Sequence, residues 1–442
     1  MFSNKDLRKL IIPLVIEQLL AVTIGMADTV MVSSCGEAAV SGISLVDSIN
    51  FLLITLFSSL ATGGAVIASQ YIGRGDHKSA SLAAKQLFYA SLALSAVLGI
   101  IAVFFRKPVL NMVFGSIEAD VMAHAQIYFL LSAISYPFLA VYNAGAALFR
   151  SMGDSRTMLI SILMNTINIV GNAILIYGFQ MAAAGAATAS LVSRAVGAII
   201  ITVLLLNPHR IIFYDKLHKP EIHLSMLKSI LQIGVPNGLE NSIFQIGKIL
   251  VASIVSGFGT ISITANAVAG NLASLQVIPG MALGMAMITV VGQCIGAKDY
   301  EAVKKYTKKL MLITYGVVWA MTLLMLLFSK QILSFYSLSE ETTTMTMEVF
   351  IVHGICAVIV WPLAFALPNA LRAANDVRFT MIVSLLSMWI FRIGFSYILA
   401  IYFNMGILGT WIAMCIDWFC RGACFVIRFA RGKWKNISFI DN

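Results

Sequence analysis

Long apolar runs, each bounded by charged or turn-forming residues, fill almost the entire chain of 442 residues. Most are at least as long as the roughly 20 residues that a helix needs to cross a bilayer. They predict an all-α membrane protein with twelve spans, near 10–34, 44–72, 86–105, 122–148, 158–178, 183–206, 228–256, 263–296, 309–328, 345–371, 380–402 and 406–429. The runs 44–72 and 263–296 exceed one bilayer thickness, so we expect a strong tilt or an interfacial piece in each.

The second half of the chain repeats polar positions of the first half. Pro13, Glu17, Gly36, Gln70, Gly73 and Asp76 fall on Pro236, Glu240, Gly259, Gln293, Gly296 and Asp299 after a shift of 223. A duplicated hydrophobic chain is typical of a transporter whose site lies at the repeat interface. We therefore expect two pseudo-symmetric six-helix lobes, 1–206 and 226–442, joined by a cytoplasmic linker at 207–225.

Composition agrees with the membrane class, since 59% of the residues are hydrophobic and only 11% are charged. A soluble domain carries about 25% charged residues. The chain contains no HExxH, GxSxG or phosphate-binding GxxxxGK[ST] motif, so we expect neither an enzyme nor ATP hydrolysis. Uphill transport by such a chain would use an ion gradient, with Na⁺ or H⁺ as the coupling ion and no other cofactor.

Lysine and arginine positions predict the orientation in the membrane. With both termini in the cytoplasm, the outside segments hold only Arg106, Lys107 and Lys330, and most other basic residues fall inside. This asymmetry satisfies the positive-inside rule. The net charge of +10 is thus attributed to topology, and we expect no nucleic-acid partner. Short loops favour a multi-pass protein of the plasma (cell inner) membrane, whose partners are the lipid bilayer and small organic molecules.

Charged residues inside spans are few, and each is a candidate functional residue. Glu17 and Asp28 are eleven residues apart on the first expected helix and share one face. Pro13 can bend that helix one turn before Glu17. An acid in this setting is a candidate carrier of a proton or of Na⁺, because burial favours its neutral form and a bound cation its charged form. The alternative is an acid near a span end that reaches water.

The fifth expected span carries a polar stripe. Its members recur at helical spacing and comprise Ser161, Asn165, Asn168 and Asn172. Amide and hydroxyl oxygens coordinate hard cations, and the same groups also hold helices together by hydrogen bonds. The repeat does not preserve these residues, since Asp28 falls on Val251. This asymmetry places the expected ion site in the first half.

The second half has different polar residues inside its spans. Glu240 and Lys248 lie on the seventh expected span, Arg392 on the eleventh, and Asp417 and Arg421 on the twelfth. Pairing of Glu240 with Lys248, or of Asp417 with Arg421, would neutralise charge within the bundle. The alternative is that Glu240 faces a cavity, where it titrates or binds a cationic substrate.

Several motifs, taken in order and in duplicate, resemble the multidrug and toxic compound extrusion (MATE) family over about residues 5 to 430. They are Pro13 with Ala27-Asp28-Thr29-Val30-Met31-Val32 and Gly36, Gln70-Tyr71-Ile72-Gly73-Arg74-Gly75-Asp76, Arg150-Ser151-Met152-Gly153-Asp154, Gly185-Ala186-Ala187, Pro236-Asn237-Gly238-Leu239-Glu240 and Gly292-Gln293-Cys294-Ile295-Gly296-Ala297. The resemblance implies twelve helices in two lobes around a V-shaped cavity, and export of drugs, organic cations or toxic metabolites in exchange for Na⁺ or H⁺.

The same resemblance implies roles for single residues. Asp28 matches the usual coupling acid of the first helix, and Pro13 matches its bend. Asn168, Asn172 and Ser190 match an Asn, an Asp and a Thr of the sodium-binding members, with Asn172 replacing a carboxylate. A Glu on the seventh helix of another group matches Phe244, while Glu240 lies one turn earlier on the same face.

A lipid or lipid-linked oligosaccharide flippase of the same superfamily is the alternative function. We expect such a flippase to carry a strongly cationic cavity, and only Arg194, Lys248, Arg392 and Arg421 fall among the basic residues of the expected spans. We also expect a monomer.

Overall fold

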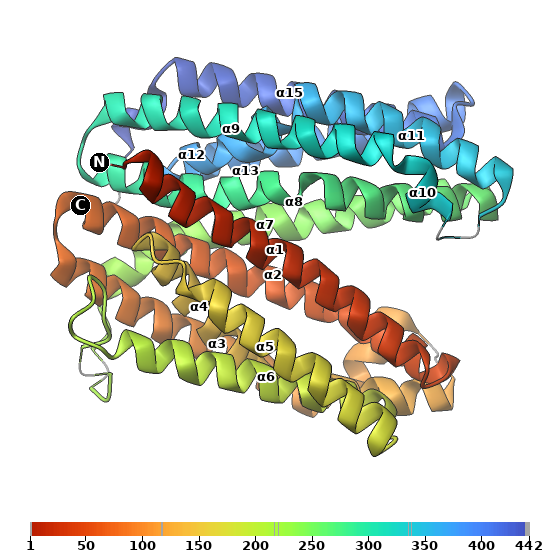
Figure 1. The fold of residues 1–442 in the computed structure, drawn as a ribbon, viewed down its shortest axis with the longest axis horizontal. Helices are drawn as coiled ribbons and strands as arrows, with labels where there is room; N and C mark the ends of the chain where they lie inside the picture. The colour runs from red at the N-terminus through yellow and green to blue at the C-terminus, as the bar shows by residue number, and fades with distance from the viewer. Residues whose placement is uncertain are drawn as a thin grey trace. The chain divides into compact units, whose positions relative to one another are not determined.

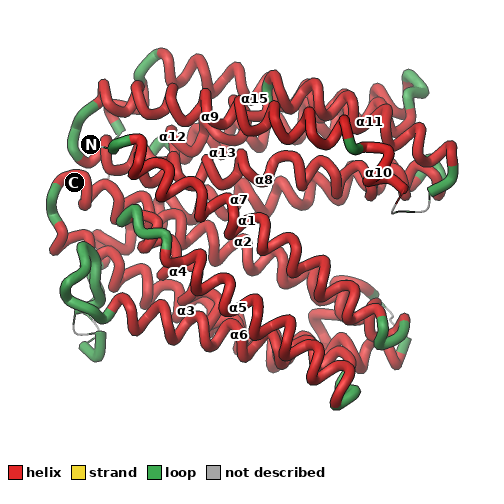
Figure 2. Tube along the Cα trace, viewed as in Figure 1, coloured by secondary structure: helices red, strands yellow, loops and turns green. Residues whose placement is uncertain are grey.

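The computed structural model describes residues 2–115, 118–215, 217–219, 221–334, 336 and 338–437, and within these ranges the side chains of all but residues 23–30. Every regular element in these ranges is a helix, as Figure 2 shows. The chain divides into two compact units, Met1–Gly238 and Leu239–Asn442, and each is described separately below.

The first unit contains six long helices and the start of a seventh (Figure 1). They are α1 (Asn4–Ser33), α2 (Glu37–Arg74), α3 (His77–Phe114), α4 (Ala119–Ser151), α5 (Arg156–Asn172) with its π-helical continuation η1 (Ala173–Gly178), α6 (Ala182–Leu205) and α7 (Leu224–Ser256). Within this unit α4 packs against α2, α3 and α6, and α1 packs against α5.

The second unit takes the remainder of α7 and all later helices. These are α8 (Thr260–Gly296), α9 (Tyr300–Leu327), α10 (Ser329–Ser334), α11 (Glu340–Ile359), η2 (Pro362–Ala366), α12 (Leu367–Ala373), α13 (Val377–Ser387), η3 (Met388–Gly394), α14 (Phe395–Tyr397), η4 (Ile398–Tyr402), α15 (Gly406–Ala430) and η5 (Lys433–Asn436).

The expected spans are confirmed as helices. Among the described residues, 11 helical segments are long and apolar enough to cross a membrane, and α1 covers the first expected span, so twelve transmembrane helices result. The third span was expected at 86–105, and α3 begins earlier, at His77. Its backbone leaves helical geometry at Phe105 (φ −107°, ψ 18°), so the expected end of the span coincides with a kink inside α3. The expected limits of the lobes and the linker stay a prediction.

The repeat recurs in the local structure. Gly36 and Gly259 precede α2 and α8 with φ of 95° and 90°, a region that glycine enters without strain. Asp76 accepts a hydrogen bond from the Ser79 N–H at 2.9 Å at the start of α3, and Asp299 accepts one from the Ala302 N–H at 2.9 Å at the start of α9. Duplicated residues therefore begin corresponding helices in each half.

Small residues bring the helices of the first unit close together. A Cβ atom on Gly42 of α2 would lie 2.9 Å from the Val121 carbonyl oxygen and 2.9 Å from the Ala125 nitrogen, both on α4. Such close approach of backbones is the usual basis of helix packing in membranes, where burial of apolar surface gives little drive.

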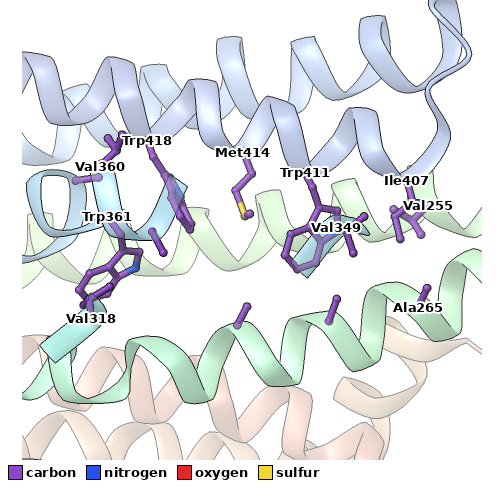
Figure 3. Packing of buried hydrophobic residues seen from close by; sticks show 14 residues of the cluster. Val255, Ala265, Val318, Val349, Val360, Trp361, Ile407, Trp411, Met414 and Trp418 are labelled. Carbon is purple, nitrogen blue, oxygen red and sulfur yellow. The ribbon is translucent and has the colours of Figure 1, made fainter. Parts of the chain in front are cut away.

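The second unit packs instead around large aromatic residues of α15. Figure 3 shows Trp411, Met414 and Trp418 projecting from α15 into a buried apolar cluster that includes Trp361 and Ala265. Trp418 also lies edge-on to Phe365 at 5.5 Å between ring centroids. This aromatic packing surrounds the buried charges described below.

Candidate functional site

The polar stripe predicted on the fifth span lies on α5, and part of it forms a hydrogen-bonded network with α6. Asn168 donates to Ser190 Oγ at 3.1 Å, and Asn172 donates to Asn168 Oδ1 at 3.5 Å. Asn168 is 6% exposed and Asn172 is 1% exposed. Both side chains are held in one orientation, and their carbonyl oxygens are of the type that coordinates hard cations.

The side chain of Asp28 lies outside the described residues, but its helix is placed. The backbone of α1 is helical from Asn4 to Ser33 and includes both Pro13 and Asp28. This helix packs against α5 and contacts η1 and α6. The helices that bear Asp28, Asn168, Asn172 and Ser190 are therefore neighbours in the first unit, while the role of these residues stays a prediction.

Glu17 is a buried partner of α4 and α5. Its Oε1 lies 3.5 Å from Arg150 Nη1, and its Oε2 accepts a hydrogen bond from Thr157 Oγ1 at 3.2 Å. Arg150 lies in the last turn of α4, and Thr157 in the first turn of α5. The carboxylate therefore links three helices at one end of the first unit, which the sequence did not reveal.

Glu240 occupies the corresponding position in the second unit. Its Oε1 accepts hydrogen bonds from Arg372 Nη2 at 2.8 Å and from Ser384 Oγ at 2.6 Å. The pairing of Glu240 with Lys248 considered from the sequence is thus wrong. That pairing rests on proximity along one helix, whereas Arg372 reaches Glu240 from the end of α12. The other carboxylate oxygen of Glu240, Oε2, is buried and has no hydrogen-bond partner among the described residues.

Asp417 lies at the centre of a second group of buried charges. It accepts hydrogen bonds from Arg421 Nη2 at 3.1 and 3.0 Å and from Ser387 Oγ, which confirms the predicted Asp417–Arg421 pair. Arg392 Nη1 lies 3.9 Å from Asp417 Oδ2. Asp417 is fully buried and Arg421 is 3% exposed, so these charges are stabilised by each other rather than by water.

Each unit contains a further Asp–Arg ion pair, and the sequence did not predict either of them. Arg210 Nη1 lies 3.0 Å from Asp154 Oδ2, and Arg428 contacts both oxygens of Asp376 at 2.6 and 3.1 Å. The duplicated Arg-x3-Asp motif located both acids. Of their partners, Arg210 follows the sixth span, whereas Arg428 lies at the end of the twelfth. The separation of the two arginines differs from that of the two acids, so the shift that relates the acids does not relate their partners.

The segment between α6 and α7 is anchored to the first unit. Tyr89 Oη donates to the Leu217 carbonyl at 2.8 Å, and Gln86 Nε2 donates to the Glu221 carbonyl at 2.7 Å. Burial raises the pKa of Tyr214 in this segment above its usual value. At the start of α3, hydrogen bonds from the Ser79 side chain and backbone N–H lower the pKa of Asp76 below 3.8. The long polar connector is therefore held against α3.

Comparisons with known proteins identify the family. The MatE family model matches residues 13–174 and 236–398. The chain is 28% identical to the uncharacterized transporter YisQ of Bacillus subtilis, over 96% of this chain and 93% of that protein. It is 26% identical to the probable multidrug resistance protein NorM of Thermotoga maritima, over 98% of this chain and 93% of NorM.

Solved structures show the same fold. An outward-facing multidrug resistance MATE family transporter of the MOP superfamily matches with a TM-score of 0.89 at 20% identity, over 98% of this chain and 97% of that chain. A crystal structure of MATE in the bent conformation matches with a TM-score of 0.88 at 21% identity, over 97% of this chain and 94% of that chain. The duplicated match of the family model corresponds to the two halves of the repeat.

Proposed function

The chain belongs to the MatE family of multidrug efflux transporters, and from this premise we propose that it is a secondary active exporter that couples entry of Na⁺ or H⁺ to efflux of drugs, organic cations or toxic metabolites. Export proceeds by alternating access, in which the binding site opens to one side of the membrane and then to the other. The proposed location is the plasma membrane, with both termini cytoplasmic and one chain as the functional unit.

One observation carries the coupling part of the proposal. The helix that bears Asp28 packs against the helix whose buried amides, Asn168 and Asn172, are connected to each other and to Ser190. In the proposed site the Asp28 carboxylate shares a hard monovalent cation with these amide and hydroxyl oxygens. In its protonated form the same group would hydrogen-bond to the amides. The packing of α1 against α5 is therefore compatible with Na⁺ or H⁺ as the coupling ion.

The identity of residue 172 bears on which ion is used. An Asn at this position gives the first-unit site one fewer negative charge than an Asp would. Each added carboxylate favours a bound cation over an empty site. With Asp28 as its one acid, the site is better matched to a proton than to a tightly bound Na⁺, and we propose proton coupling as the first case to test.

Efflux from proteoliposomes tests the proposal directly. The purified chain is reconstituted with ethidium inside, and a Na⁺ gradient or a pH gradient is imposed separately. Ethidium efflux that follows one gradient and stops when an ionophore collapses it supports ion-coupled export. The absence of efflux under either gradient, from vesicles in which the protein is folded and correctly oriented, contradicts the proposal and leaves a lipid flippase as the reading to test with labelled lipid.

A further inference from the structure

Two basic side chains share a single acid inside the second unit. Arg421 makes two hydrogen bonds to Asp417, and Arg392 lies 3.9 Å from the same carboxylate. Lys248 lies one helical turn after Phe244 on α7, and the Phe244 ring contacts both guanidinium groups. Three of the four basic residues that the sequence places inside spans therefore belong to this region, and one carboxylate neutralises only one of them.

Aromatic rings form one wall of this group. The Arg392 and Arg421 guanidinium carbons each lie 5.3 Å from the centre of the Phe244 ring, and that of Arg421 lies 5.2 Å from the Phe365 ring. Phe244 and Phe365 are themselves edge to face at 6.2 Å. We call the set Lys248, Arg392, Arg421, Phe244 and Phe365 the basic–aromatic cluster. Its rings offer a flat apolar surface beside the positive charges.

Several donors of the cluster have no acceptor. The Nε atoms of Arg392 and Arg421, and Nε1 of the adjacent Trp418, are buried and lack a hydrogen-bond partner within the described part of the chain. The oxygens of Asp417 are already engaged by Arg421 and Ser387. Buried donors normally find acceptors, so the cluster lacks an acceptor as well as negative charge.

The arrangement is costly unless a ligand completes it. Uncompensated positive charge within a membrane span is unfavourable and by default indicates a functional site. Arg421 and Asp417 are buried, the Arg392 side chain is 11% exposed, and Lys248 is exposed. The accessible side of the group is therefore the side of Lys248 and Arg392.

We propose that the basic–aromatic cluster binds the carboxylate of an aromatic organic anion. Guanidinium groups match the planar carboxylate, and a ring attached to it packs on Phe244 and Phe365. The excess of two positive charges over Asp417 disfavours a simple organic cation at this position. That the bound anion is a transported substrate rests on the export function proposed above, whereas binding itself does not.

Calorimetric titration of the full-length protein in detergent tests this binding with matched probes. Benzoate and benzylammonium have the same ring and opposite charges, and inorganic phosphate serves as an oxyanion without a ring. We expect saturable binding of benzoate that is stronger than that of either other probe. Arg392→Gln and Lys248→Gln each weaken benzoate binding by about tenfold or more, because each removes a charged partner. Arg194→Gln, the matched loss of a span arginine in the first unit, leaves benzoate affinity unchanged.

The opposite change strengthens the test. Asp417→Asn removes the competing acid and raises the affinity for benzoate, whereas a purely structural role of the cluster predicts no gain. If this variant does not fold, the two Gln variants decide the question, with folding checked by elution profile and melting temperature.

Three results would overturn the inference: no benzoate binding by the folded wild type, equal benzoate affinity in the Gln variants, or stronger binding of phosphate than of benzoate. Absence of benzoate binding with intact ethidium efflux would remove this inference alone. Benzoate binding without gradient-driven ethidium efflux would instead count against the proposed export function.

Discussion

Glu17 and Glu240, separated by 223 positions, each face an arginine from the last turn of another helix in the same unit, at 3.5 Å from Arg150 and 2.8 Å from Arg372. A hydroxyl group completes each pair, from Thr157 in the first unit and from Ser384 in the second. The duplication has thus preserved the buried Glu–Arg pair, whereas the hydroxyl donors Thr157 and Ser384 are not equivalent positions of the repeat.

The two pairs differ in geometry, and we expect Glu240→Gln to destabilise the protein more than Glu17→Gln. Breaking a buried pair by removing one partner costs about 3–5 kcal/mol, and the Glu240 pair is shorter and better covered. Apparent melting temperatures in detergent give the comparison. Combining Glu240→Gln with Arg372→Met should recover part of the loss. Equal effects of the two single changes would contradict the difference in strength.

Arg428 holds Asp376 by two contacts, whereas Arg210 holds Asp154 by one. We therefore expect Arg428→Gln to lower the free energy of unfolding by about 2–3 kcal/mol, because the buried carboxylate of Asp376 loses both hydrogen bonds from the charged guanidinium group. Arg210→Gln is the matched variant and should cost about 1 kcal/mol, since Asp154 is partly exposed. Thermal unfolding of both variants measures the difference, and a larger effect at Arg210 would count against this assignment.

Asn172→Asp adds a carboxylate beside Asn168. We expect it to increase the affinity of the first-unit site for Na⁺ by at least about tenfold, and so to make efflux depend on Na⁺, because a unit charge about 4 Å from the ion contributes about 4 kcal/mol at an effective dielectric constant of 20, less the cost of burying it. Asn172→Ala controls for loss of the amide. Sodium dependence that is the same in the Asp and Asn proteins would argue against a cation site at this stripe.

Asp76 gives a prediction on pH. Its folded-state pKa lies below 3.8 because Ser79 donates hydrogen bonds to the carboxylate. A lowered folded-state pKa means that the stabilising contribution is full above about pH 4 and is lost as pH falls through the folded-state value. Asp76→Asn keeps a capping side chain without charge. The difference in melting temperature between wild type and Asp76→Asn should be largest at neutral pH and shrink as pH falls below about 4, and a difference independent of pH would contradict the assignment.

The sequence predicted what depends on local geometry. The stripe on α5 and the pair Asp417–Arg421, four residues apart, followed from helical spacing. The repeat related Asp76 to Asp299, and the structure shows that both cap helices. Glu240 shows the limit of this reasoning. Its partner lies on another helix, so proximity along one helix suggested Lys248 while tertiary packing selected Arg372.

The meeting of Lys248, Arg392 and Arg421 was hidden for the same reason. The three residues lie on three different helices, and only their packing brings them together. Their scarcity in the spans was visible in the sequence and suggested a weakly charged interior. Packing brings the few basic residues of the spans into one region of the second unit. The local density of positive charge there is therefore higher than the average over the spans.

Gradient-driven efflux by Asp28→Asn, compared with wild type in the same proteoliposomes, tests the central claim most directly. The account predicts that wild-type ethidium efflux follows either the pH or the Na⁺ gradient, and that Asp28→Asn abolishes it while ethidium binding to the detergent-purified variant is retained. Undiminished gradient-driven efflux in Asp28→Asn would contradict coupling in the first unit and would make Glu240 the next acid to test.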